Sequence, residues 1–309
     1  MSVLRDLFLA MSTNALMRQF VVGFPLSRRV SRRFVAGETV DEAIQVVKKL
    51  RTQGIDVTFD QLGESVTNET EARAAKDGYL RALDAIAVSQ VSSQVSVKLT
   101  QMGLDINPDL CLANMRQILQ RAHAVGTLVT IDMEDSKHTQ ITLNVFKTLR
   151  EEFDNVGIVL QSYLYRSEED FKALIALGAN IRLCKGAYKE PADVAFPHKK
   201  DVDANYIKLA QLFFDSNGSA KRAYLDLATH DEKIIAWAKT YVTTHHVDRK
   251  RFEFQMLYGI RSDLQRQLVA AGYTMRVYVP CGTHWYPYFM RRLAERPANV
   301  IFLISNLFK

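Results

Sequence analysis

Short apolar runs alternate with helix-like segments along most of the chain. The runs are rich in β-branched or aromatic residues, and most of them end in a polar residue. Three of the helix-like segments are followed by Gly126, Gly178 or Gly272, at the position where a glycine ends a helix. This pattern predicts eight strands, at residues 57–59, 95–99, 128–131, 157–161, 181–183, 224–229, 252–257 and 275–279.

Eight strand–helix units favour an α/β fold with an all-parallel sheet. Eight is the strand number that closes into a (β/α)8 TIM-type barrel, and about 250 residues is a usual size for one. We therefore predict a catalytic barrel over residues 51–309, preceded by an N-terminal helical arm over residues 1–50 that could serve as a lid. An open doubly wound sheet is the alternative fold, and a plug at the bottom of the barrel is the alternative role for the arm.

The composition is that of an ordinary globular protein, with 48% hydrophobic and 24% charged residues. No uncharged run reaches the roughly 18 residues that a membrane-spanning helix needs. The net charge of +6 includes a cluster formed by Arg28, Arg29, Arg32 and Arg33. We interpret this cluster as a solvated helical face, with contact to an anionic membrane surface as the alternative. No nucleic-acid motif accompanies it, so we do not expect nucleic acid as a partner.

Several familiar sites are excluded by missing motifs. The three cysteines cannot all pair, and none lies in a C-x-x-C arrangement, which indicates a reduced, intracellular protein. No histidine spacing typical of a metal site occurs, so we expect no metal. No G-x-G occurs among the 14 glycines, so side chains at strand ends would have to hold any nucleotide cofactor. The side chains suited to this task are Gln161, Arg182, Lys185 and Thr229.

The active site of an α/β barrel lies at the carboxyl ends of its strands, so polar residues at these positions are candidates for the site. Any one of them could be a structural polar group, but together they form a predicted ring. In chain order the ring contains Asp60, Glu64, Lys98, Asp132, Glu134, Asp135, Gln161, Arg182, Lys185, Tyr188, Thr229, His230, Asp231, Gln255 and Tyr278.

The segment after the last strand places four polar residues on one helical face. Tyr288, Arg291, Arg292 and Glu295 follow the i, i+3, i+4, i+7 spacing of a helix. Guanidinium groups bind carboxylates through two parallel hydrogen bonds, so adjacent arginines are suited to hold a substrate carboxylate. A solvated face with an Arg291–Glu295 ion pair is the alternative interpretation.

Several motifs together resemble the proline dehydrogenase family, which includes monofunctional enzymes and a domain of bifunctional proline-utilisation flavoproteins. They are FDQLGE, IDMEDS, RLCKGAY, EFQMLYG and YVPCGTH followed by YxxRRxxER, and the likeness runs from residue 56 to residue 299. The resemblance implies a distorted barrel that oxidises L-proline to Δ1-pyrroline-5-carboxylate with FAD, in the first step of proline catabolism. It also implies that the electrons pass to a quinone in the membrane.

The same resemblance implies roles for individual side chains. Lys98, Arg291 and Arg292 would hold the substrate carboxylate, Asp132 would orient this clamp, and Glu64 would pair with Arg291 as a gate. The pyrrolidine ring would be enclosed by Leu183, Tyr188, Leu257, Tyr278 and Tyr288. Residues along the FAD would be Gln161, Arg182, Cys184, Lys185, Ala187, Tyr188, Thr229, His230 and Gln255.

Partners and location follow from the same resemblance. We expect a cytoplasmic enzyme with peripheral contact to the inner face of the cell membrane, and a separate dehydrogenase that takes up pyrroline-5-carboxylate. Tyr278 favours proline over hydroxyproline, because its ring would crowd the hydroxyl group. Two other functions stay open, namely a Schiff-base lyase that uses Lys98 or Lys185 and a scaffold without enzymatic activity.

Overall fold

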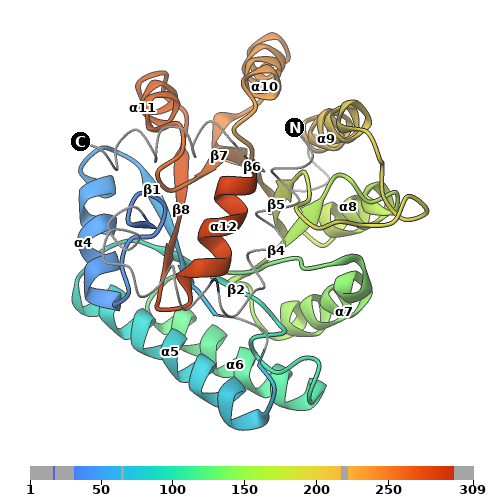
Figure 1. Ribbon diagram of the computed structural model, residues 1–309. Helices are drawn as coiled ribbons and strands as arrows, with labels where there is room; N and C mark the ends of the chain where they lie inside the picture. Colours follow the sequence, from blue (N-terminus) through green and yellow to red (C-terminus); the bar gives the residue numbers. More distant parts are fainter. Residues whose placement is uncertain (1–16, 18–30, 64–65, 217–221, 296–309) are drawn as a thin grey trace.

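Eight parallel strands form a closed barrel in the computed structural model, which describes residues 17, 31–63, 66–216 and 222–295 (Figure 1). Each strand pairs with the next, and β8 pairs with β1 to close the ring. The strands are β1 (Asp56–Gln61), β2 (Gln94–Val97), β3 (Val129–Ile131), β4 (Val156–Gln161), β5 (Asn180–Cys184), β6 (Tyr224–Ala228), β7 (Phe252–Leu257) and β8 (Met275–Cys281). The predicted (β/α)8 barrel is confirmed, and the open sheet is wrong.

Within the described residues, eight helices surround the strands and a further helix lies across the middle of the ring (Figure 1). The outer helices are α4 (Val40–Arg51), α5 (Glu69–Val88), α6 (Pro108–Ala124), α7 (Ser136–Glu152), α8 (Ser167–Ala176), α9 (Lys199–Asp215), α10 (Glu232–Thr244) and α11 (Ser262–Ala270). The helix across the ring is α12 (Trp285–Glu295), and a short 3-10 helix, η1 (Arg249–Arg251), precedes β7. Because helices cover every strand, the strands are almost wholly buried. This burial explains why the strands appear in the sequence as apolar runs.

Helix α4 belongs to the barrel although it lies within the predicted arm. A capping box between Thr39 and Glu42 begins the helix. Its apolar face contributes Ala43, Ile44 and Val47 to the same core as the strands, and the helix packs against β1, β8 and α5. The predicted division at residue 51 therefore cuts through the packed shell of the barrel. Residues 1–16 and 18–30 lie outside the described part, so an arm there stays a prediction.

The segment before α4 and helix α12 share a second apolar cluster. Phe34 contacts Phe289, with their ring centroids 6.1 Å apart, and the cluster also holds Trp285. The backbone of the segment before α4 lies very close to the loop between β7 and α11. A Cβ added to Gly259 in this loop would lie 1.7 Å from the carbonyl oxygen of Arg33. Gly259 also has a φ of +75°, so a side chain there would be strained as well as obstructed. Residues 33 and 34 are thus fixed between α12 and this loop.

Charged side chains lie deep inside the barrel. On β8, the Arg276 guanidinium donates to both carboxylate oxygens of Glu253 on β7, with N–O distances of 2.5 and 3.0 Å. Asp226 on β6 is fully buried beside this pair. Burial, reinforced by the negative charge of Glu253, raises the pKa of Asp226 to about 8.

We predict that Asp226→Asn makes stability less dependent on pH. An unfolded aspartate releases its proton near pH 4, whereas folded Asp226 keeps it until about pH 8. The unfolded chain therefore binds fewer protons in this window, and the stability of the wild type falls as the pH rises from about 4 to 8. Denaturant unfolding at pH 5 and pH 8 measures the effect. Between these values the free energy of unfolding of the variant should increase, relative to that of the wild type, by roughly 1 kcal/mol per pH unit. An equal difference at both pH values would contradict the assignment.

Candidate active site

A cavity of about 1200 Å³ lies at the carboxyl ends of the strands. Residues in or directly after each of the eight strands line it together with α12, so most of the polar strand-end residues predicted from the sequence converge on one space. Pockets for a single drug-sized ligand are usually about 300–1,000 Å³, so this cavity has room for a large cofactor together with a small substrate.

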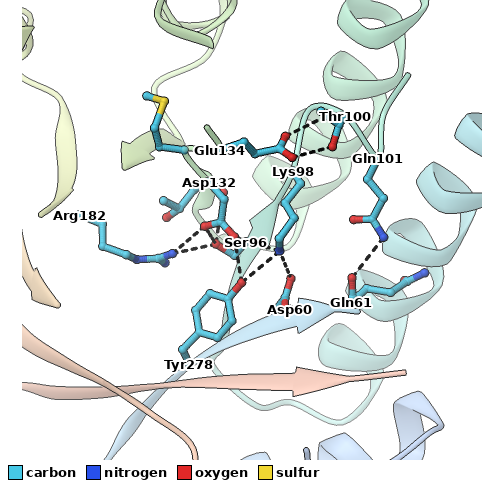
Figure 2. Close-up of polar contacts among 12 residues, drawn as sticks. Asp60, Gln61, Ser96, Lys98, Thr100, Gln101, Asp132, Glu134, Arg182 and Tyr278 are labelled. Carbon is cyan, nitrogen blue, oxygen red and sulfur yellow. Dashed lines mark hydrogen bonds and ion pairs between the residues drawn. The ribbon is translucent and has the colours of Figure 1, made fainter. Parts of the chain in front are cut away.

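Asp132 connects four donors from three separate parts of the barrel, as Figure 2 shows. Its Oδ1 accepts hydrogen bonds from Ser96 Oγ at 2.6 Å and from Arg182 Nη1 at 3.0 Å. Its Oδ2 accepts from the Tyr278 hydroxyl at 2.8 Å and from Lys98 Nζ at 3.2 Å. Burial alone would raise the pKa of Asp132, but the charges of Lys98 and Arg182 outweigh it and lower the pKa. An ionised carboxylate therefore fixes side chains from β2, β5 and β8.

Lys98 lies between two carboxylates at the end of β2. Its Nζ is 3.1 Å from Asp60 Oδ1 and 3.2 Å from Asp132 Oδ2. Burial tends to lower the pKa of Lys98, but the negative charges of Asp60 and Asp132 raise it well above the usual value. The side chain is therefore an ammonium group at neutral pH, which suits it to attract an anion. An ammonium nitrogen has no lone pair with which to attack a carbonyl, and this argues against Lys98 as a Schiff-base nucleophile.

The opposite part of the cavity is lined by a second group of charged residues. Lys185 Nζ pairs with Asp203 at 2.5 Å and with Asp231 at 2.7 Å. Next to it, the Oγ1 of Thr229 accepts a hydrogen bond from the Asp231 amide at 3.1 Å. His230 Nε2 accepts from the amide of Leu257 at 3.0 Å, so in a neutral ring the proton sits on Nδ1. Amino, imidazole and hydroxyl groups are donors that bind phosphate oxygens.

In the cavity lining, the acceptor Gln161 Oε1 and the donor Arg182 Nη2 are buried without a hydrogen-bond partner among the described residues. The rest of each side chain is held firmly, since Gln161 Nε2 donates to the Glu134 carbonyl at 3.1 Å and Arg182 Nη1 donates to Asp132. A buried polar atom left without a partner costs roughly 1–3 kcal/mol, so these two atoms are suited to a ligand with both a donor and an acceptor.

Helix α12 brings the predicted arginines to the cavity. Tyr288, Arg291 and Arg292 all line it. Arg292 is buried with its guanidinium carbon 5.0 Å from the centre of the Tyr288 ring, while Arg291 is exposed. Glu64 and the side chain of Glu295 lie outside the described residues, so the gate and the Arg291–Glu295 pair stay predictions.

The structure also places the remaining predicted residues. Of the predicted residues that the structure describes, Leu183 and Asp135 do not line the cavity. The side chain of Leu183 is fully buried in the barrel core, whereas Asp135 caps helix α7 and accepts a hydrogen bond from the His138 amide. Side chains alternate along a strand, and on β5 the neighbours of Leu183 are the two that face the cavity. Burial raises the pKa of one of them, Cys184, to about 12, so its side chain is a neutral thiol. The cavity lining otherwise includes Ala187, Tyr188, Gln255 and Leu257 as expected.

Ser96 is a site residue that the sequence analysis missed. It is fully buried, donates to Asp132, and accepts a hydrogen bond from Arg182 Nη1 at 2.8 Å. A signal was present in the sequence, because Ser96 lies two residues before Lys98 and side chains two apart on a strand face the same way.

Comparison with known proteins gives a consistent set of relatives. A family profile described as proline dehydrogenase matches residues 43–304. Proline dehydrogenase 1 of Bacillus subtilis (strain 168) is 44% identical over 307 residues, which cover 99% of this chain and 100% of that protein. The proline dehydrogenase of Deinococcus radiodurans is 43% identical over 285 residues, which cover 91% of this chain and 90% of that protein.

A solved structure shares the fold. Proline utilization A from Bdellovibrio bacteriovorus, inactivated by N-propargylglycine, matches with a TM-score of 0.82 and 26% sequence identity. The match covers 95% of this chain but only 37% of that larger chain. The TIM-type barrel found here is therefore also present as one part of a longer protein.

Proposed function

The chain belongs to the proline dehydrogenase family and oxidises proline, the first step of proline catabolism, and we propose that it acts on L-proline in the cavity at the barrel mouth. We propose FAD as the cofactor, which when bound supplies the acceptor for the hydride that leaves proline C5. The product is then Δ1-pyrroline-5-carboxylate. The observation that carries the proposal is the convergence of Lys98, Arg291 and Arg292 on a cavity large enough for both ligands.

The residues of the cavity fit FAD. Gln161 Oε1 and Arg182 Nη2 are the buried acceptor and donor that a flavin ring, with its N–H and carbonyl groups, would satisfy. At the other end, Lys185, Thr229 and His230 provide donors for the phosphates. Cys184, Ala187, Tyr188 and Gln255 complete the proposed FAD contacts.

The substrate end of the cavity combines cations with aromatic rings. Three cations, Lys98, Arg291 and Arg292, would hold the proline carboxylate. The rings of Tyr278 and Tyr288, with Tyr188 and Leu257, would pack on the pyrrolidine carbons and exclude water. Because the hydroxyl of Tyr278 is bonded to Asp132 at 2.8 Å, its ring cannot easily turn aside for a substituted substrate. We therefore propose that proline is preferred over hydroxyproline.

The electrons must leave the protein after each turnover, and we propose that a quinone accepts them. Within the described part of the chain, no helix has the length and apolar character to cross a membrane. We propose that the basic segment at residues 28–33 provides peripheral contact with an anionic membrane surface. Arg32 is well exposed, although its guanidinium also pairs with Glu42 at 2.5 Å. We further propose that a separate dehydrogenase consumes pyrroline-5-carboxylate.

The first test is a visible spectrum of the purified protein. We expect flavin absorbance that bleaches when L-proline is added without oxygen, because the hydride then reduces the cofactor. Hydroxyproline at the same concentration serves as the control and should bleach the flavin more slowly. A folded protein that binds no FAD, or bound FAD that proline does not reduce, would refute the proposal.

A second test addresses the carboxylate clamp. Arg292→Met removes one charge-assisted pair, worth roughly 1.5–3 kcal/mol, so KM for proline should rise at least about tenfold while kcat changes less. Arg266→Met, at an exposed arginine of α11, is the matched control and should leave both constants unchanged. Unaltered steady-state kinetics in Arg292→Met would remove Arg292 from the clamp.

A third test concerns the membrane. Replacing Arg28, Arg29, Arg32 and Arg33 together by glutamine should weaken binding to vesicles that contain anionic lipid, while activity with a soluble electron acceptor stays near that of the wild type. Vesicles of neutral lipid provide the baseline for sedimentation. Equal sedimentation of the two proteins with anionic vesicles would mean that the cluster is only a solvated surface.

A further inference from the structure

We propose that Glu253, buried in β7 beneath the cavity, is a positioning residue that holds the Arg182 guanidinium in the active site by fixing the amide of Gln255. The inference rests on the proposed function, because it assigns a supporting residue to that same site. Glu253 does not line the cavity and is 1% exposed, so it can act on the reaction only through other side chains.

A chain of three side chains connects Glu253 with the site. Gln255 Nε2 donates to Glu253 Oε1 at 2.7 Å, and Arg182 Nε donates to Gln255 Oε1 at 2.7 Å. Both Gln255 and Arg182 are buried, so water does not substitute for either bond. The chain crosses the inside of the barrel from β7 to β5.

The direction of this chain is dictated by the chemistry of its ends. An ionised carboxylate can only accept hydrogen bonds, and a guanidinium can only donate them. The Gln255 amide lies between the two, so its NH2 must face Glu253 and its oxygen must face Arg182. Without the carboxylate, the amide could turn over, and its NH2 would then oppose the N–H of Arg182.

Glu253 is itself anchored to the barrel wall. Arg276 Nε and Nη2 hold its two carboxylate oxygens at 2.5 and 3.0 Å, and Arg276 Nη1 donates to the Val57 carbonyl of β1 at 3.0 Å. The carboxylate therefore has a fixed place against which Gln255 can be aligned.

The position of Arg182 matters for the site because its other nitrogens serve it directly. Nη1 donates to Asp132 and to Ser96, at 3.0 and 2.8 Å (Figure 2). The guanidinium carbon lies 5.4 Å from the centre of the Tyr278 ring. If the guanidinium rotated to relieve a clash with Gln255, Nη1 would move away from Asp132. Nη2 would then change its position in the cavity lining.

The test is a double-variant cycle with Glu253→Gln, Gln255→Leu and the combination of the two. Glu253→Gln keeps the shape but places an NH2 where one carboxylate oxygen accepted, and Gln255→Leu breaks the chain at its middle. We expect each single variant to lower kcat/KM for proline at least tenfold and to shift the absorbance bands of bound flavin in the same direction. The double variant should fall no further than Gln255→Leu, because Glu253 acts only through Gln255.

A purely structural role gives a different result. Losses that multiply in the double variant, or a flavin spectrum that Glu253→Gln leaves unchanged, would overturn the proposal. Glu168→Gln, in a surface ion pair of α8 with Lys172, is the matched control and should keep wild-type kinetics and spectrum. If Glu253→Gln does not fold, Glu253→Met combined with Arg276→Met replaces the buried pair by apolar side chains, and it should reproduce the Gln255→Leu loss. A wild type without flavin or without proline oxidation would instead refute the proposed function.

Discussion

The carboxylate of Asp132 accepts hydrogen bonds from Ser96, Lys98, Arg182 and Tyr278, and the geometry of the proposed substrate end of the cavity depends on it. These donors come from three strands that pair with other neighbours in the sheet, so backbone pairing alone would not fix them relative to one another. A buried anion with two cationic partners is also hard to replace, because removing it would leave Lys98 and Arg182 uncompensated. The same contact thus supplies both the shape and the charge of the site.

Charge in the cavity is arranged in layers. Deep in the barrel mouth, Asp60 and Asp132 face Lys98 and Arg182, so two negative charges meet two positive ones. Arg291 and Arg292 on α12 then add positive charge at the outer side of the same space. The carboxylate of a substrate would therefore meet the positive charges of the outer layer first, while the charges of the inner layer balance one another without the substrate.

The sequence predicted the barrel because each strand is a short apolar run with a distinct polar end. The rule that sites lie at the carboxyl ends of strands found Lys98, Asp132 and Gln161 for the same reason. The rule missed residues inside the strands. In the sequence Ser96 and Glu253 resemble isolated polar residues, because their partners lie on other strands. The sequence places helix α4 in an arm because it precedes the first of the eight predicted strands, and only the closed barrel shows that it packs against β1 and β8.

One helix completes the wall of the barrel, and a different helix covers its mouth. The place between α11 and α5 in the ring is taken by α4, which precedes β1, while the helix after β8 lies over the mouth (Figure 1). In an ordinary barrel the helix after the last strand completes the wall, so changes in it threaten the whole fold. Here the wall is complete without α12, and its apolar contacts form a cluster separate from the main core. The residues of α12 that line the cavity can therefore change in evolution with little penalty in the integrity of the barrel.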